Sequence, residues 1–320
     1  MRIERRRFLE RAAGVSVAAS AASLLPTRAV LAVSDAPLAV PFGDGEFLSL
    51  SDGHLTLPVD FVMPDSIGAA ERSAFLAEHG LGPDTLTPDC NVTLWRTPER
   101  LVLFDVGAGT QFMPGAGLLP ESLAAAGVDP LEVTDVVLTH AHPDHLWGVL
   151  DDFDELAFPE AAYHVHRDER DYWLASGTLA NTPDASKPFV VGAQNRLPLL
   201  DERLVPFDWG DEILPGVEAV DTHGHTPGHS SFALHAGSDS VLVLGDALTN
   251  AAISFARPAW PSGTDQDPDK AIRTRLALLE RLAGENAAVL GFHLPAPGLG
   301  RVERDGASER DPVYRFVSDG

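Results

Sequence analysis

Four side chains able to bind metal ions fall within six residues, in the segment Thr139-His140-Ala141-His142-Pro143-Asp144-His145. Imidazole and carboxylate groups are ligands for Zn²⁺ and related divalent ions. Because alternate side chains of an extended segment point the same way, His140 and His142 can reach one ion together. Pro143 marks a turn, after which Asp144 and His145 project differently and suit a second ion nearby. The segment predicts a metal site rather than a solvated His-rich loop.

The elements that must position these ligands are short apolar runs typical of buried strands. The first run, residues 136–138, directly precedes the His/Asp segment. Three later runs, at 217–220, 241–244 and 288–290, are followed by further ligand candidates: His225, Asp246 and His293. Ligands at strand ends are where an α/β scaffold usually places a site. We therefore expect four segments to meet at one metal site.

The remaining pattern predicts a mixed α/β chain. We expect hairpin strands up to residue 60 and strands at 91–95, 101–104, 162–166 and 232–234. Helical spacing predicts helices at about 121–126, 168–175 and 269–283, whereas 64–90, 177–200 and 257–268 are expected to be loops, the first of them with a short helix. His164 and His166 form another His-x-His pair, but with no third ligand nearby they are interpreted as ordinary strand residues.

The N-terminus has the organisation of an export signal. Arg5-Arg6-Arg7-Phe8-Leu9 precedes an uncharged apolar stretch, residues 12–25, and small residues near Ala32 offer a cleavage site. These basic, apolar and small-residue regions predict a secretory signal, and the paired arginines resemble a twin-arginine signal. We expect residues 1–32 to be this signal, residues 33–320 to form a single domain, and the protein to be periplasmic or secreted.

Charge and cysteine content narrow the partners. The chain has a net charge of −24, and because residues 1–32 carry six arginines and two glutamates, the remainder carries −28. Such an acidic surface repels nucleic acid and anionic lipid, so we expect neither nucleic-acid binding nor membrane binding after signal cleavage. The single Cys90 excludes an intramolecular disulfide. The expected partner is a small molecule, and a homodimer stays open.

The motifs together resemble the metallo-β-lactamase-fold hydrolases. The matching series is His140-x-His142-x-Asp144-His145, His225 within Gly-His-Thr-Pro-Gly-His, Gly245-Asp246 and Gly291-Phe292-His293, with Asp105-x-Gly107 matching the family's early Asp-x-Gly turn. The phrases at 50–53, 223–229 and 293–300 are most similar to methyl parathion hydrolase and its exported relatives. The resemblance implies an αββα sandwich, in which two mixed β-sheets lie face to face with helices outside.

The resemblance also implies a role for each ligand. His140, His142 and His225 would hold a first ion, Asp144, His145 and His293 a second, and Asp246 would bridge them. The expected cofactors are two divalent ions, with Zn²⁺ expected first and Mn²⁺, Fe²⁺ or Co²⁺ also compatible. Two such ions supply hydroxide and polarise the oxygen of the bond being attacked. Asp144 is the expected proton acceptor, Asp105 and His229 would orient ligands, and His223 is interpreted as a non-ligand.

Aromatic residues and scarce basic residues indicate the substrate class. The candidate pocket walls are Phe112, Trp147, Phe153, Phe158, Trp173 and Phe189. Few lysines and arginines favour neutral, apolar esters, meaning aryl esters, lactones or organophosphate triesters. Lactone-opening relatives typically place a tyrosine shortly after the bridging aspartate, where this chain has Thr249. The alternatives are a β-lactamase, an iron-dependent redox protein on the same scaffold, or a non-catalytic metal-binding protein.

Overall fold

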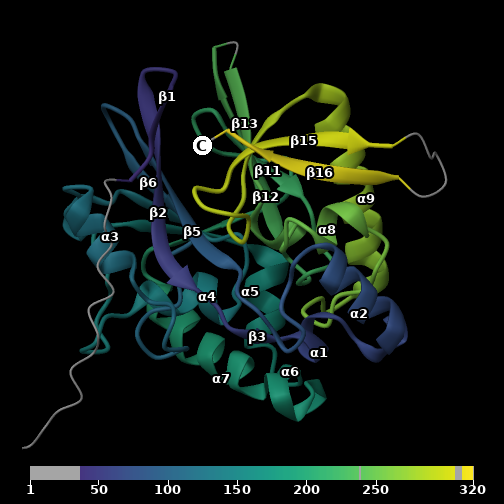
Figure 1. Cartoon of the computed structure of the whole chain (residues 1–320). Helices are drawn as coiled ribbons and strands as arrows, with labels where there is room; N and C mark the ends of the chain where they lie inside the picture. Colours follow the sequence, from purple (N-terminus) through teal and green to yellow (C-terminus); the bar gives the residue numbers. More distant parts are fainter. Residues whose placement is uncertain (1–36, 238, 307–311, 320) are drawn as a thin grey trace, which may run out of the picture. The chain divides into compact units, whose positions relative to one another are not determined.

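The computed structural model describes residues 37–237, 239–306 and 312–319. The expected export signal, residues 1–32, lies outside the described residues. Two seven-stranded sheets form the centre of residues 37–319 (Figure 1). The first sheet has the order β1-β2-β5-β6-β7-β8-β9 and the second the order β10-β11-β12-β13-β14-β15-β16, while β3 pairs with β4. Both large sheets are mixed, with parallel pairs from β6 to β9 and between β13 and β14.

The strands of the first sheet are β1 (Ala39–Phe42), β2 (Gly45–His54), β5 (Asp89–Arg96), β6 (Leu101–Phe104), β7 (Asp135–Val137), β8 (Ala162–His166) and β9 (Leu204–Phe207). Those of the second are β10 (Glu212–Leu214), β11 (Val217–Asp221), β12 (Ser230–Ala236), β13 (Asp239–Val243), β14 (Ala288–Leu290), β15 (Leu299–Asp305) and β16 (Val313–Ser318). The small pair is β3 (Leu57–Pro58) and β4 (Thr85–Leu86).

The α-helices are α1 (Val59–Val62), α2 (Ala69–Glu78), α3 (Leu119–Ala125), α4 (Pro143–Leu146), α5 (Arg167–Leu174), α6 (Thr178–Asn181), α7 (Lys187–Arg196), α8 (Ile253–Ala256) and α9 (Pro268–Glu285). Short 3-10 helices are η1 (Asp65–Ile67), η2 (Pro130–Glu132), η3 (Trp147–Val149), η4 (Asp184–Ser186), η5 (Leu197–Leu200) and η6 (Gly245–Ala247). The helices predicted near 121–126, 168–175 and 269–283 correspond to α3, α5 and α9.

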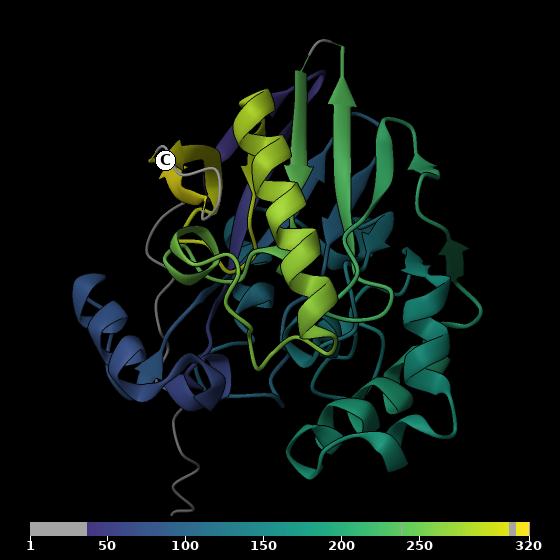
Figure 2. The ribbon, with the colours of Figure 1, turned by 90° about the vertical axis from the view of Figure 1, so that its right-hand side faces the viewer.

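Apolar clusters show why the elements stack in four layers. Phe104 and Phe232 belong to a cluster between the two sheets, and their ring centroids lie 5.7 Å apart. A second cluster joins the first sheet to α3, α4, α5 and α7, and a third joins the second sheet to α8 and α9. Figure 2 shows α9 lying across the outer face of the second sheet. Because both faces of the sheets are covered, central strands such as β5 are buried continuously rather than alternately. The predicted αββα sandwich is confirmed.

The prediction of a long loop at 177–200 is wrong, because this segment contains α6, η4, α7 and η5. Its proline and glycine content suggested a loop, but Pro188 lies at the first turn of α7, where proline is tolerated. Gly192 lies inside α7 because a Cβ there would be 2.3 Å from the Trp147 ring. Close packing against Trp147 therefore requires glycine at position 192, although a glycine in the sequence alone indicates a loop.

Candidate metal centre

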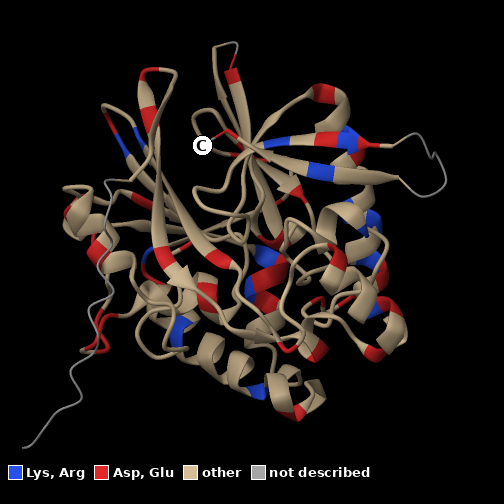
Figure 3. Cartoon of the chain, in the orientation of Figure 1, with Lys and Arg blue, Asp and Glu red and all other residues tan. Residues whose placement is uncertain are grey.

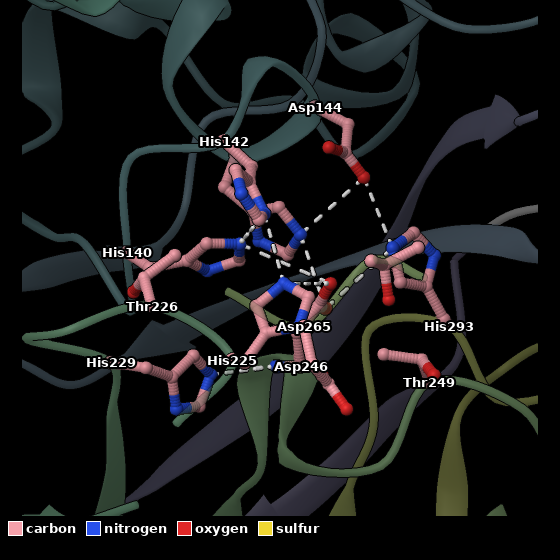
Figure 4. Close-up of polar contacts among 12 residues, drawn as sticks. His140, His142, Asp144, His225, Thr226, His229, Asp246, Thr249, Asp265 and His293 are labelled. Carbon is pink, nitrogen blue, oxygen red and sulfur yellow. Dashed lines mark hydrogen bonds and ion pairs between the residues drawn. The ribbon is translucent and has the colours of Figure 1, made fainter. Parts of the chain in front are cut away.

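The seven predicted ligands lie close together in the structure, and Figure 4 labels all of them except His145. His140 and His142 lie in the turn after β7, and Asp144 and His145 belong to α4, which begins at Pro143. The other three follow β11, β13 and β14: they are His225, Asp246 and His293. All of these except His142 are buried. The four strands β7, β11, β13 and β14 therefore each lead into a ligand segment, as the apolar runs in the sequence predict.

One set of ligand atoms surrounds a first subsite. His142 Nδ1 lies 3.0 Å from His140 Nε2 and 2.9 Å from His225 Nε2. Asp246 Oδ2 lies 3.2 Å from His225 Nε2 and 3.9 Å from His140 Nε2. Ligand atoms at about 2.0–2.1 Å from a tetrahedral zinc ion are themselves about 3.3 Å apart. The four side chains therefore have the spacing of a metal ligand set.

The second set lies on the other side of Asp246. Asp144 Oδ2 is 3.0 Å from His293 Nε2 and 3.4 Å from His145 Nε2. Asp246 Oδ1 is 3.2 Å from His145 Nε2 and 3.6 Å from His293 Nε2. One carboxylate oxygen of Asp246 thus faces each group. Asp246 therefore belongs to both groups of potential ligands.

Three atoms of the second set are buried polar atoms that make no hydrogen bond, although their oppositely charged neighbours are close: Asp144 Oδ2, His145 Nε2 and Asp246 Oδ1. A buried polar atom without a hydrogen bond costs about 1–3 kcal/mol, so a common partner would stabilise all three. A divalent ion is a partner that satisfies all three at once. The donor set and its geometry therefore fit a metal ion.

The two predicted orienting residues contact the ligands. Asp105 Oδ2 lies 2.7 Å from His145 Nδ1 and accepts a hydrogen bond from Thr139 Oγ1. His229 Nε2 accepts a hydrogen bond of 2.8 Å from the backbone N–H of Asp246. Asp105 therefore holds the far nitrogen of one ligand ring, whereas His229 holds the backbone of the bridging carboxylate.

Sequence reasoning missed further groups that hold ligand rings. Asp265 Oδ1 lies 3.0 Å from His225 Nδ1, and its other oxygen accepts a hydrogen bond of 2.8 Å from Arg275 Nη2. The backbone carbonyl of Asp89 lies 2.8 Å from His293 Nδ1. Asp265 lies in the Pro-rich segment 257–268, where no local pattern marks it, and a backbone carbonyl has no sequence signal at all.

A cavity of about 350 Å³ opens onto the ligands, with His142, Asp144, His225, Asp246 and His293 among its lining residues. Three of the predicted pocket aromatics line it: Phe112, Trp173 and Phe189. The prediction is wrong for the other three. Trp147 packs against Gly192 and beneath Arg196, Phe158 is in the core, and Phe153 is 83% exposed. Among the described residues that line the cavity, none is a lysine or arginine.

The family model of the metallo-β-lactamase superfamily matches residues 87–293, which include all seven ligands. The chain belongs to the metallo-β-lactamase superfamily. It is accordingly a metal-binding hydrolase, in agreement with the ligand geometry above.

Several known proteins resemble the chain over most of its length. Probable metallo-hydrolase Rv2300c of Mycobacterium tuberculosis is 29% identical over 240 residues, covering 64% of this chain and 72% of the relative. The solved structure of AidC, a dizinc quorum-quenching lactonase, has a TM-score of 0.81 and 27% identity, covering 89% of this chain and 97% of AidC. The solved structure of the hydrolase AbOPH has a TM-score of 0.79 and 26% identity, covering 89% of this chain and 98% of AbOPH.

Burial and charge control protonation of this superfamily member's ligands. Burial lowers the pKa of His140 and His142 well below the ordinary value, so both are neutral. Burial acts the same way on His225, but the carboxylates of Asp246 and Asp265 outweigh it and raise the pKa of His225 to about 9. The pKa of His145 is likewise raised above its usual value, because nearby carboxylates outweigh burial. Without metal, protons on these rings balance the carboxylates.

Proposed function

We propose that the chain is a dinuclear hydrolase of neutral, apolar esters, a class that comprises aryl esters, lactones and organophosphate triesters. The observation that carries the proposal is the position of Asp246, whose two oxygens face two separate ligand groups. His140, His142 and His225 would hold one ion, and Asp144, His145 and His293 the other. Zn²⁺ suits these nitrogen and oxygen ligands.

Two bound ions would supply hydroxide near neutral pH and polarise the carbonyl or phosphoryl oxygen of the substrate. The chain's own residues do the rest. Asp144 lines the cavity and belongs to the second ligand set, so it is the carboxylate best placed to accept a proton during attack. Asp105, Asp265 and the carbonyl of Asp89 keep the ligand rings in fixed orientations.

The cavity wall supports the substrate class. One wall is apolar and comes from the segment around β3, α1 and β4: Leu55, Leu57, Phe61, Val62 and Leu86. A second wall carries the aromatic rings of Phe112, Trp173 and Phe189. Burying about 100 Å² of an apolar leaving group or acyl chain there contributes about 2.5 kcal/mol. With no lysine or arginine among the described lining residues, neither side chain offers an anionic phosphomonoester an ion pair there.

The acidic composition of the chain also favours neutral substrates, since acidic side chains outnumber basic ones 47 to 23 in the sequence. Figure 3 shows where both kinds lie in the described part of the chain. A negative field repels anionic substrates before they reach the cavity. Neutral substrates are unaffected. Both the local lining and the overall field therefore favour uncharged esters.

We also propose that the chain is an exported relative of methyl parathion hydrolase. Asp52, in the 50–53 phrase, accepts hydrogen bonds from the backbone N–H groups of Ala108, Gly117 and Leu119. Asn91 Nδ2 donates to the carbonyls of Phe292 and Leu294 beside the last ligand. The twin-arginine signal at residues 1–32 and a periplasmic or secreted location belong to the same proposal.

The test is a comparison of kcat/KM on matched substrates, with purified full-length protein of measured metal content. The panel contains a neutral aryl ester, a lactone, a phosphotriester, a phosphomonoester and a chromogenic β-lactam. We expect the neutral aryl-leaving-group substrates to react fastest, lactones to be intermediate and the anionic phosphomonoester to be slowest. A preference for the phosphomonoester or the β-lactam, or no ester hydrolysis with both metals bound, would refute the proposal.

A pair of phenylalanine variants tests the cavity itself. Phe189 lines the cavity, and its ring lies 6.0 Å from that of His142, whereas Phe153 is exposed and lines no part of it. Phe189→Ala should raise KM for aryl esters more than it lowers kcat, because it removes uniform binding of the apolar group. Phe153→Ala is the matched control and should leave both constants unchanged.

A further inference from the structure

Glu169 is a buried carboxylate that belongs to neither ligand set. It lies in the first turn of α5, directly after β8, and only 1% of it is exposed. Its two oxygens nevertheless accept four hydrogen bonds from three different segments of the chain. Each of these segments is part of the metal centre or of the cavity.

Oε1 joins the first ligand turn to the cavity wall. It accepts a hydrogen bond of 2.8 Å from the backbone N–H of Ala141, the residue between His140 and His142. It also accepts one of 2.7 Å from Trp173 Nε1. The Trp173 ring lines the cavity and lies edge-on to the His142 ring, with centroids 5.7 Å apart.

Oε2 holds the loop that follows His225. It accepts hydrogen bonds of 2.7 Å from Thr226 Oγ1 and 2.9 Å from the backbone N–H of Gly228. A Cβ at Gly228 would lie 2.2 Å from the backbone nitrogen of Glu169, so only glycine lets the loop reach the start of α5. This contact accounts for the second glycine of the Gly-His-Thr-Pro-Gly-His phrase.

All four partners are donors, so the group that receives them must be an acceptor at both oxygens. An ionised carboxylate meets this requirement, and charge-assisted hydrogen bonds are stronger than neutral ones. The first turn of a helix also favours negative charge. A glutamine of the same shape would turn its amide N–H groups toward two of the donors.

We propose that Glu169 is the positioning residue of the first subsite, tying the turn between His140 and His142 to the loop after His225 and both to the cavity wall through Trp173. The inference rests on the proposed assignment of His140, His142 and His225 as ligands of one ion. It adds a buried anion that sets the geometry of that ion's ligands without contacting the ion.

The experiment measures zinc affinity by competition with a chromogenic chelator. It uses full-length protein carrying His293→Ala, in which only the first subsite keeps its complete ligand set. Adding Glu169→Gln should weaken zinc binding about 10–100-fold, the range seen when a group that orients metal ligands is removed. Asp52→Asn is the matched control, because Asp52 is also a buried carboxylate that accepts three hydrogen bonds but contacts neither ligand loop.

A general structural role would give a different result. In that case Glu169→Gln and Asp52→Asn would lower the melting temperature by similar amounts, and the two variants would bind zinc with the same affinity. That result would overturn the proposal. Ester hydrolysis is not needed for this measurement, so absence of activity on every ester would refute the proposed function while leaving the affinity result to decide the role of Glu169.

Two milder variants keep the test decisive if Glu169→Gln does not fold. Thr226→Val removes one of the four hydrogen bonds without changing charge, whereas Thr226→Ser retains the hydroxyl. We expect weaker zinc binding for the valine variant only, and equal affinities would overturn the proposal. In protein with both subsites intact, Trp173→Phe removes only the hydrogen bond from Trp173 Nε1 to Glu169. It should raise KM without changing zinc affinity. A loss of zinc affinity in this variant would contradict the proposal that Trp173 serves the cavity wall and not the metal ligands.

Discussion

Replacing Asp265 by asparagine should weaken the first subsite although Asp265 lies outside both ligand sets. Its carboxylate is buried between His225 Nδ1, at 3.0 Å, and Arg275 Nη2, at 2.8 Å. Asparagine keeps the size of the side chain but removes its charge. The imidazole of His225 then loses the anion that makes its other nitrogen a better ligand.

Two separate magnitudes follow from this geometry. Loss of an orienting carboxylate lowers metal affinity about 10–100-fold, which is about 1.4–2.8 kcal/mol. The same change leaves the buried guanidinium of Arg275 without its counter-charge, and breaking a buried pair from one side costs about 3–5 kcal/mol of folding free energy. The double variant Asp265→Asn/Arg275→Met removes the unpaired charge but also the hydrogen bonds from Arg275 to the carbonyls of Pro258 and Trp260. It should therefore recover part of the stability without recovering zinc affinity.

The assay is chelator competition for affinity together with thermal unfolding for stability. Asp221 provides a matched control, because its carboxylate lies 2.5 Å from His223 Nδ1. This second carboxylate–histidine pair is exposed, and His223 lies only two residues before His225. Asp221→Asn should change neither quantity, since exposed ion pairs contribute little. If Asp265→Asn binds zinc as tightly as the unsubstituted protein, or if affinity returns together with stability in the double variant, the reasoning is wrong.

Further predictions concern metal content, pH and export. Asp246→Ala should abolish activity and reduce the metal content below two ions per chain, and full activity of the native protein with one ion would contradict a bridging role. Because the pKa of His225 is raised to about 9 without metal, zinc binding displaces a proton below that pH. Zinc affinity should therefore rise from pH 7 to 9, and a flat profile over this range would argue against the assignment. The double variant Arg5→Lys/Arg6→Lys should leave uncleaved precursor in the cytoplasm, which cell fractionation would detect. Normal export of this variant would contradict the twin-arginine proposal.

The metal ligands could be predicted from sequence because their signals are local. Each of the four ligand segments follows an apolar run, and parallel neighbours in a sheet end at the same edge. His140 and Asp144 belong to one short phrase, and Asp246 and His293 follow strands that are parallel neighbours. The αββα fold followed from the resemblance that these phrases carry.

Other features depend on distant segments and have no local signal. Asp265 orients His225 across 40 residues of chain, and Glu169 meets Thr226 across 57. Nothing in the neighbourhood of either acid distinguishes it from the many solvated acids of this chain. Only folding brings a carboxylate to the rings or N–H groups that need an acceptor, and only burial makes that acceptor necessary.

The aromatic residues show the same division. Composition indicates that rings are available for a cavity, but Phe112, Trp147 and Phe158 are the same kind of residue in sequence and have different surroundings in the structure. Helix α7 carries Phe189, which lines the cavity, and packs its Gly192 against Trp147, which does not. This helix forms in a segment whose proline and glycine indicate a loop. Sequence alone predicted the candidate ligands and, through the resemblance, the fold class, because both predictions depend on short phrases and strand ends. Tertiary structure alone decided which acids orient the ligands and which rings line the cavity, because both depend on contacts between segments far apart in the chain.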